Sequence, residues 1–425
     1  MRIVNGVLTG ESVRADSRWG DLDRLRVRSR MVDAVIDEVR GRRIRIGDRW
    51  LADFASCNYL GFDLDRKIIE SVPAALDAWG THPSWSRLLG SPRTCLDIEE
   101  RLTELLAAPD TLVLPTITHI HMSVIPALAG RGHMLIDAQA HRTVYDGCAV
   151  ARGQGATLHR FRAGDLEQLE QMLRMIPLGE SRLVCMDGVN SMTGNTPDLA
   201  GFARVCREYG ALLYIDDAHG FGLVGEHQDA AHPYGRRGNS IVRYADETYD
   251  NVVLVGGFSK AYSSLLAFVA VPTSLKNHLK VVAAPYLYSG PAPTASLATV
   301  LAGLRVNETR GDTLRADLAG KTRRVLEHVR ALGLHTPNIS GLPIIELPLA
   351  HAGDVGAVGE FLFDHGIYTT LALYPMVPRD QVGFRIQITA ANRGDEIDQL
   401  NDTLTKLAGR FELQQRGMAP PDDRA

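Results

Sequence analysis

The chain has 425 residues, of which 45% are hydrophobic and 23% are charged, an ordinary composition for a globular protein. Its 46 basic and 50 acidic residues give a formal net charge of −4, which gives no support to binding of nucleic acid or of an anionic membrane. Because no run of about 18 apolar residues occurs and the five cysteines lack CxxC spacing, we expect a cytoplasmic protein with reduced thiols and neither a transmembrane helix nor a secretory signal.

The segment before residue 50 is rich in arginine, and its apolar spacing predicts one helix near residues 25–39. Beyond it, short apolar runs alternate with amphipathic segments. The runs lack polar alternation, which favours strands covered on both faces. They are residues 111–115, 133–137, 182–187, 211–216, 251–256 and 267–272. Helical spacing between the runs predicts a mostly parallel, doubly wound α/β sheet, with its ligand site beyond the carboxyl ends of the strands.

After residue 290 the pattern changes to long helices, two short strands over 343–349 and 383–390, and a last amphipathic helix. The polar end of the chain, which contains proline and glycine, predicts a flexible tail. We therefore predict four parts. They are an N-terminal arm over 1–50, a large α/β domain over 51–290, a small α+β domain over 291–412 and a tail over 413–425.

Four polar side chains follow three of the predicted strands. Asp216 and His219 lie in YIDDAHG, Lys260 follows VGGFS, and His141 ends IDAQAH. Pyridoxal phosphate chemistry needs this combination, because a lysine amine holds the aldehyde and a carboxylate keeps the pyridine nitrogen protonated so that the ring accepts electrons. One imidazole can donate a hydrogen bond to the phenolic oxygen, and another can stack on the ring. The pattern predicts these residues at one cofactor site.

Each residue also has an alternative interpretation. A lysine in a Gly/Ser loop is usually a solvated charge, and D-D-x-H could bind Mg²⁺ or Mn²⁺. His119 and His121 are spaced like residues on one face of a strand and could bind zinc, although no third and fourth ligand is evident. The lysine loop lacks Walker spacing. The joint occurrence of the four residues in this order favours the cofactor site, and we predict no metal.

Six motifs resemble those of the α-oxoamine synthases, a branch of the fold-type-I pyridoxal phosphate enzymes that includes 8-amino-7-oxononanoate synthase and serine palmitoyltransferase. They extend over about 330 residues in the family's order. The motifs are NYLGF (58–62), SRLLGS (86–91), AHRTVYDG (140–147), DGVNSMTGN (187–195), YIDDAHGFGLVGE (214–226) with GGFSKAYSS (256–264), and VPRDQVGFRIQIT (377–389). The resemblance implies a fold-type-I transferase with a large and a smaller domain.

The resemblance also implies a role for each matching residue. Lys260 would form the Schiff base and move the proton at the substrate Cα, while Asp216 would pair with the pyridine nitrogen. His219 would contact the phenolic oxygen, and His141 would stack on the ring. The remaining cofactor contacts would come from Thr116, Ile117, Thr118, Asp187, Ser191 and Ser259, and from Ser289 and Gly290 of a neighbouring subunit. We therefore expect a homodimer with a shared active site.

Substrate binding is implied for Asn58 and Arg385. In GFRIQIT, Phe384, Ile386 and Ile388 share one strand face, so Arg385 lies on the other, where its guanidinium could bind a carboxylate through two hydrogen bonds. Without the resemblance, Arg385 could also be a surface arginine of a strand.

Some positions depart from the family pattern. Gly257 stands where the family has a threonine or serine that donates to the phosphate, and Ile117 stands where it has a glycine. Asp187 replaces a glutamate, the glycines after the lysine are missing, and residues 227–250 form an unusual insertion. These departures bear on the substrate more than on the cofactor.

The reaction implied by the resemblance condenses an amino acid with an acyl thioester such as an acyl-CoA. Two alternatives keep the cofactor. One is γ-elimination or replacement on S-adenosylmethionine or a related amino acid, and the other is transamination.

Overall fold

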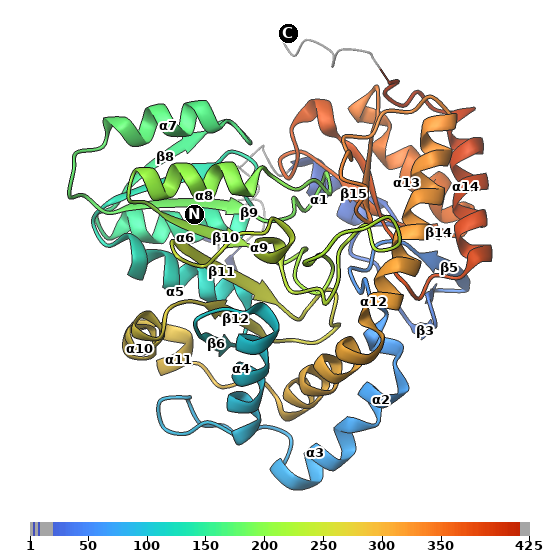
Figure 1. Cartoon of the computed structure of the whole chain (residues 1–425). Helices are drawn as coiled ribbons and strands as arrows, with labels where there is room; N and C mark the ends of the chain where they lie inside the picture. The colour runs from blue at the N-terminus through green and yellow to red at the C-terminus, as the bar shows by residue number, and fades with distance from the viewer. Residues whose placement is uncertain (1–2, 5–6, 9–19, 417–425) are drawn as a thin grey trace. The chain divides into compact units, whose positions relative to one another are not determined.

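The computed structural model in Figure 1 describes residues 3–4, 7–8 and 20–416. The chain forms two compact units, one over Cys57–Gly320 and one over residues 1–56 and 321–425. The predicted division into arm, large domain, small domain and tail stays a prediction. Most of the first 19 residues of the predicted arm, and residues 417–425 of the predicted tail, lie outside the described residues. Among the residues that are described, no helix has the length and apolar character needed to cross a membrane.

A seven-stranded sheet organises the unit over Cys57–Gly320. Its order is β6-β12-β11-β10-β9-β7-β8, and every neighbouring pair is parallel except those that involve β12. The strands are β6 (Thr111–Leu114), β7 (His133–Asp137), β8 (Thr157–Phe161), β9 (Arg182–Asp187), β10 (Leu212–Asp216), β11 (Val252–Gly257) and β12 (Ala267–Ala270). This confirms the predicted mostly parallel α/β fold.

Helices cover both faces of this sheet, with α7 and α8 on one side and α5 on the other (Figure 1). The helices and short turns are η3 (Phe62–Leu64), α2 (Arg66–Ile69), α3 (Ser71–Trp79), α4 (Arg93–Leu106), α5 (Ile117–Ala129), α6 (Arg142–Gly153), α7 (Leu166–Met175), α8 (Leu199–Glu208), α9 (Ile241–Tyr244), α10 (Thr273–Val282) and α11 (Ala284–Leu287). Buried aliphatic side chains of α5 and α6, such as Val124 and Val144, pack on Leu183 and Val255 of the sheet. Burial on both faces explains why these strands read as continuous apolar runs.

The long helix α12 (Thr294–Ala331) belongs to this unit up to Gly320 and to the second unit from Lys321. In the second unit, one sheet has the order β14-β5-β4-β3 and another the order β13-β16-β15. The elements are α1 (Gly20–Arg28), β3 (Glu38–Arg40), β4 (Arg43–Ile46), β5 (Arg49–Asp53), β13 (Ile344–Pro348), η4 (Ala352–Asp354), α13 (Val355–Asp364), β14 (Ile367–Tyr368), β15 (Thr370–Ala372), η5 (Arg379–Gln381), β16 (Gly383–Gln387) and α14 (Gly394–Ala408), with β1 (Ile3–Val4) and β2 (Val7–Leu8) paired.

The structure corrects the prediction of a helix near residues 25–39. Helix α1 ends at Arg28, and residues 38–40 form a strand that pairs with β4 across Gly41. Gly41 has φ +60°, a conformation that favours glycine and closes a tight turn. Strand pairing on the two sides of this turn therefore outweighs the helical spacing of the apolar residues. Strand β8 was also not predicted, because its sequence TLHRF contains only two aliphatic or aromatic residues.

Residues 413–416 of the predicted tail make backbone contacts. Leu413 bridges Leu349, and Gln415 bridges Leu334. Leu413 is also buried, with 3% of its surface exposed.

A buried carboxylate lies in the small sheet β13-β16-β15. Glu346 on β13 pairs across the sheet with Arg385 on β16, which in turn pairs with Thr370 on β15. Glu346 is fully buried, and neither of its carboxylate oxygens has a hydrogen-bond partner among the described residues. Burial raises the pKa of Glu346 to about 7, although the positive charge of Arg385 opposes the rise.

This burial makes the stability of the protein sensitive to pH. The pKa of Glu346 is higher in the folded chain than in the unfolded chain, so the unfolded state releases its proton first as pH rises. The loss of stability begins above the unfolded pKa and is complete once pH exceeds about 7. The free energy of unfolding of wild type should therefore fall relative to that of Glu346→Gln as the pH rises. From about pH 5 to about pH 8 the difference should grow by about 2 to 3 kcal/mol in favour of Glu346→Gln.

Urea unfolding of both proteins at the two pH values measures this difference. Glu327→Gln, at an exposed position of α12, is the matched control and should follow the wild type. An equal pH dependence in Glu346→Gln and wild type would contradict the prediction.

Candidate active site

A cavity of about 190 Å³ lies at the carboxyl ends of the central strands. It gathers residues that are far apart in the sequence, because the parallel strands β9, β10 and β11 all end at the same edge of the sheet. Asp187 and Asp216 end β9 and β10 in direct register, and Lys260 follows β11. The lining residues are Thr116, Ile117, Thr118, His141, Thr143, Asp187, Val189, Ser191, Asp216, Ala218, His219, Ser259 and Lys260.

The loop that carries Lys260 is held by buried aromatic rings. Phe258 and Tyr262 flank the lysine at two residues on either side, and both are almost fully buried. The ring of Tyr262 stacks on Phe221 with 5.1 Å between centroids and 9° between planes. The backbone N–H of Ser263 donates to the carbonyl of Lys260 at 2.9 Å. Packed rings on both sides therefore fix the backbone at the half-buried lysine.

The glycine-rich motif after Asp216 makes room for this loop. Gly222 has φ +83°, and a Cβ there would lie 2.7 Å from the Cβ of Ala261 and 2.9 Å from the ring of Tyr262. The sequence AYSS lacks the glycines that are usual after the lysine. It fits here because Gly222, in the facing turn after β10, has no side chain.

Asp216 is buried, with 4% of its surface exposed, and its carboxylate accepts two hydrogen bonds. Its Oδ1 accepts from the backbone N–H of Ala218 at 3.0 Å, and its Oδ2 lies 3.0 Å from Nε2 of His121. Burial alone would raise the pKa of Asp216, but its interaction with His121, helped by Lys260 and His141, lowers it to about 2. The site therefore keeps an ionised carboxylate at its base.

The two histidines expected near the cofactor have different surroundings. His219 is buried, and its Nδ1 lies 2.8 Å from the hydroxyl of Tyr59, which is also buried. His141 is exposed at the N-cap of α6, where its Nδ1 accepts from the backbone N–H of Thr143 at 3.3 Å. Its own backbone N–H donates to Oδ1 of Asp187 at 2.9 Å. Nδ1 of His141 is an acceptor here, which leaves Nε2 to carry the proton in the neutral ring.

The two other carboxylates near Asp216 have raised pKa values. Burial and the neighbouring charge of Asp216 raise the pKa of Asp187 well above its usual range. Burial likewise raises the pKa of Asp217, whose Oδ2 accepts from the backbone N–H of Ile241 at 3.0 Å. Ile241 lies in the 227–250 insertion, so the insertion contacts the DDAHG motif through this hydrogen bond to Asp217. Of the three carboxylates, Asp216 is the one held in its charged form.

Helix α5 brings its N-terminus to the cavity. Thr116 is the N-cap, and its side chain accepts from the backbone N–H of His119 at 3.3 Å. Thr116, Ile117 and Thr118 all line the cavity. Backbone N–H groups in the first turn of a helix have no partner within that helix and favour anions. The start of α5 is therefore suited to a phosphate group.

Two of the departures from the family pattern compensate each other. A Cβ at Gly257 would lie 2.5 Å from Cδ1 and 3.0 Å from Cγ1 of Ile117. The side chain of Ile117 thus fills the space that a hydroxyl side chain at position 257 would need. The bulky side chain at position 117 therefore requires a residue without a side chain at position 257.

Four predicted site residues do not line the cavity. Ser289 and Gly290 follow α11, and the Ser289 hydroxyl donates to the carbonyl of Gly290 at 2.9 Å. Asn58 is half-buried, and its carbonyl accepts from the backbone N–H of Gly61 at 2.9 Å. Arg385 belongs to the second unit, on β16 beside Glu346. The roles of these four residues stay predictions.

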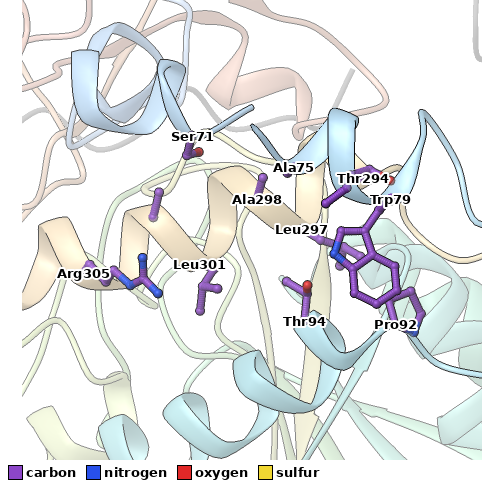
Figure 2. Close-up of a pocket in the computed structure, with 12 residues that line it drawn as sticks. Ser71, Ala75, Trp79, Pro92, Thr94, Thr294, Leu297, Ala298, Leu301 and Arg305 are labelled. Carbon is purple, nitrogen blue, oxygen red and sulfur yellow. The ribbon is translucent and has the colours of Figure 1, made fainter. Parts of the chain in front are cut away.

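A second cavity of about 190 Å³ has a different character (Figure 2). It lies between α3, the start of α4 and the first half of α12, and Trp79 and Leu297 project into it. Among the described residues that line this cavity, Arg305 is the only ionisable one. These described lining residues include no carboxylate, imidazole or amine, so the cavity offers no general acid or base.

Sequence reasoning missed three residues of the site and misplaced one motif. His119 and His121 lie on helix α5, so the interpretation as a strand pair that binds zinc is wrong; His119 is exposed and His121 binds Asp216 and Tyr214. In the described ranges, no cluster of three or more His, Cys, Asp or Glu side chains could hold a metal ion. Tyr59 and Tyr214 lie within the motifs NYLGF and YIDDAHG, but no role was predicted for their side chains, and His121 was considered only as a zinc ligand. The Tyr-x-Asp alternation at 214–216 does place both side chains on one face of β10.

Comparisons with known proteins agree with this site. The family model described as aminotransferase class I and II matches residues 51–404. A putative 8-amino-7-oxononanoate synthase of Desulforudis audaxviator is 32% identical, over 83% of this chain and 88% of that protein. The serine palmitoyltransferase of Caulobacter vibrioides is 28% identical, over 82% and 84% of the two chains. The solved structure of Sphingomonas wittichii serine palmitoyltransferase has a TM-score of 0.86 at 25% identity and covers 95% of this chain and 100% of that one.

Fold, site and comparisons define a fold-type-I enzyme of the pyridoxal phosphate class. Within it, this chain belongs to the α-oxoamine synthase family. The residues present fit the cofactor, because one cavity combines the Lys260 amine, the ionised Asp216 and the N-terminus of α5. These groups match an aldehyde, a pyridine nitrogen and a phosphate, respectively.

The packing of Ile117 against Gly257 predicts a coupled pair of substitutions. Gly257→Ser should lower the free energy of unfolding by about 1 to 2 kcal/mol, because the new side chain must displace Ile117. In an Ile117→Ala background the same change should cost about 1 kcal/mol less.

A double-mutant cycle by urea unfolding measures this coupling. Gly153→Ser is the control, since a Cβ at Gly153 meets no atom within 4 Å. Equal costs of Gly257→Ser in both backgrounds would show that the two positions are independent.

Proposed function

We propose that the enzyme joins an amino acid to the acyl group of a thioester with formation of a carbon–carbon bond. The observation that carries this proposal is the shared cavity of Lys260 and the ionised Asp216 in a chain of the α-oxoamine synthase family. Relatives named 8-amino-7-oxononanoate synthase and serine palmitoyltransferase support a reaction of this class.

Pyridoxal phosphate, when bound, supplies an aldehyde for amines and a ring that withdraws electrons from the substrate Cα. In this proposal Lys260 holds the cofactor through its Nζ and later moves the proton at the substrate Cα. Asp216 stays ionised beside the ring nitrogen, His219 contacts the phenolic oxygen and His141 covers the ring. Asp187, Ser191 and Ser259 complete the ring and phosphate contacts, together with Thr116, Ile117 and Thr118.

The ionisation states in the cavity suit these roles. Asp216 accepts hydrogen bonds through both oxygens, so its orientation is fixed before any ligand arrives. The raised pKa of Asp187 favours its protonated form, which leaves Asp216 as the charge that faces a protonated ring nitrogen. The half-buried Lys260 lies on a loop fixed by aromatic packing, so its amine needs little reorganisation to react.

Arg385 and Asn58 are proposed to bind the amino acid, with the guanidinium paired to the substrate carboxylate. Glu346 lies across the strand pair from Arg385. The second substrate is proposed to be an acyl-CoA or a similar thioester. A homodimer in which Ser289 and Gly290 serve the partner's phosphate site is part of the same proposal, as is action in the cytoplasm.

The substrate class is tested by product analysis. Purified holoenzyme is incubated with single amino acids, each with and without an acyl-CoA, and we expect free CoA and a new carbon–carbon product only when both substrates are present. Release of methylthioadenosine from S-adenosylmethionine would instead support γ-elimination, and formation of pyridoxamine phosphate would support transamination. Either of these outcomes without CoA release would overturn the condensation.

Lys260→Ala should remove the visible absorbance that pyridoxal phosphate gains on joining a lysine. Turnover should fall by at least about 10²-fold to 10⁴-fold, because Lys260 is the group proposed to move the Cα proton. Absorbance spectra and steady-state assays provide the two measurements. Lys67→Ala, on the exposed side of α2, is the control and should retain both properties. Wild-type turnover in Lys260→Ala would refute the assignment of the lysine.

A further inference from the structure

A buried chain of hydrogen bonds lies behind the cavity and joins Asp216 to His121 and Tyr214. His121 on α5 is fully buried, and both of its ring nitrogens have partners. Nε2 lies 3.0 Å from Oδ2 of Asp216, and Nδ1 lies 2.8 Å from the hydroxyl of Tyr214. Tyr214 and Asp216 are two residues apart on β10, so both side chains point toward α5. One imidazole therefore bridges them.

The partners of His121 determine which nitrogen carries its proton. The ionised Asp216 can only accept a hydrogen bond, so Nε2 must donate. Burial raises the pKa of Tyr214 well above its usual range, so the phenol keeps its proton and can donate it to Nδ1. A second proton on Nδ1 would leave the phenol without a strong acceptor, since its buried neighbours Cys148 and Cys185 are thiols. The chain of bonds is satisfied when His121 is neutral with its proton on Nε2.

Close packing keeps this imidazole in place. A Cβ on Gly147 of α6 would lie 2.5 Å from the carbonyl oxygen of His121, so the two helices approach each other closely at this turn. The ring of His121 meets the ring of Tyr214 edge to face, with 5.7 Å between centroids. The close approach of the helices and the contact with Tyr214 hold the ring in an orientation in which its Nε2 lies 3.0 Å from Oδ2 of Asp216 before a ligand binds.

We propose that His121 is a positioning residue that keeps the Asp216 carboxylate ionised and oriented for the ring nitrogen of pyridoxal phosphate, with Tyr214 fixing the neutral form of the imidazole. The inference rests on the proposed function only in taking Asp216 as the partner of the ring nitrogen. In the absence of the His121 N–H, the buried carboxylate favours its protonated form and contributes less to cofactor binding.

The first test measures the dissociation constant of pyridoxal phosphate for three variants of the full chain. His121→Phe keeps a ring but has no donor, and should bind the cofactor about tenfold or more weakly. His121→Gln places an amide N–H near the position of Nε2 and should bind more tightly than His121→Phe. His119→Phe changes an exposed residue of the same helix and should bind like wild type. A packing role would reverse the order of the Phe and Gln variants, and that order would overturn the proposal.

The second test uses the wild-type protein alone, so it does not depend on how a variant folds. In nitrogen-15 NMR spectra of histidine-labelled wild type, with and without pyridoxal phosphate, His121 should show the neutral form protonated at Nε2. An imidazolium, or a proton on Nδ1, would overturn the proposal. Both readouts are independent of acyl transfer. A wild type that binds the cofactor through Asp216 but releases no CoA refutes the proposed reaction alone, whereas wild-type cofactor affinity in His121→Phe refutes this inference alone.

Discussion

The charge on Asp216 is the constraint on which the arrangement of the cavity depends. A carboxylate with 4% of its surface exposed loses most of its hydration, at a cost of the order of several kcal/mol if nothing replaces it. Here the N–H groups of His121 and Ala218 replace the water, one on each oxygen. The replacement works because β10 ends at Asp216 and places it within reach of helix α5 on one side and of its own turn on the other.

The neighbouring carboxylates show how selective that compensation is. Asp187 lies beside Asp216 in register and Asp217 follows it in sequence, yet both have raised pKa values. Each accepts a single backbone N–H in place of the imidazole, from His141 and Ile241 respectively. Three acidic residues on adjacent strand ends thus separate into one charged group and two that favour the protonated form. One ionised carboxylate suits a cofactor with one basic ring nitrogen.

Much of the fold could be predicted because its signals are local. The strands of the large sheet were recognisable as apolar runs, since residues buried on both faces leave no polar alternation. The predicted helix near residues 25–39 extends too far, and the hairpin at residues 38–46 was not predicted, because its tight turn at Gly41 and the pairing of β3 with β4 depend on contacts that apolar spacing does not record. Strand β8 was missed for a related reason: it lies at the edge of the sheet, where burial does not require an apolar sequence.

The departures from the family pattern show that a motif does not reveal which of its residues contact each other in the folded chain. Gly257 and Ile117 each looked like the loss of a phosphate contact when considered alone. In the folded chain they are neighbours, and the isoleucine side chain occupies the space beside the glycine. The 227–250 insertion gave no functional signal either, yet its Ile241 amide supports Asp217 behind the cavity.

The sequence by itself determined the family, the cofactor class and the groups that we propose for the chemistry, because Lys260, Asp216, His219 and His141 occur in short motifs whose residue types the proposed reaction requires. Only the tertiary structure decided which of the buried acids is ionised and what keeps it so. That property depends on His121, a residue 95 positions away from Asp216 in the chain. Hydrogen bonds and burial act through space, and a helix that crosses a sheet brings together side chains that no motif spacing connects.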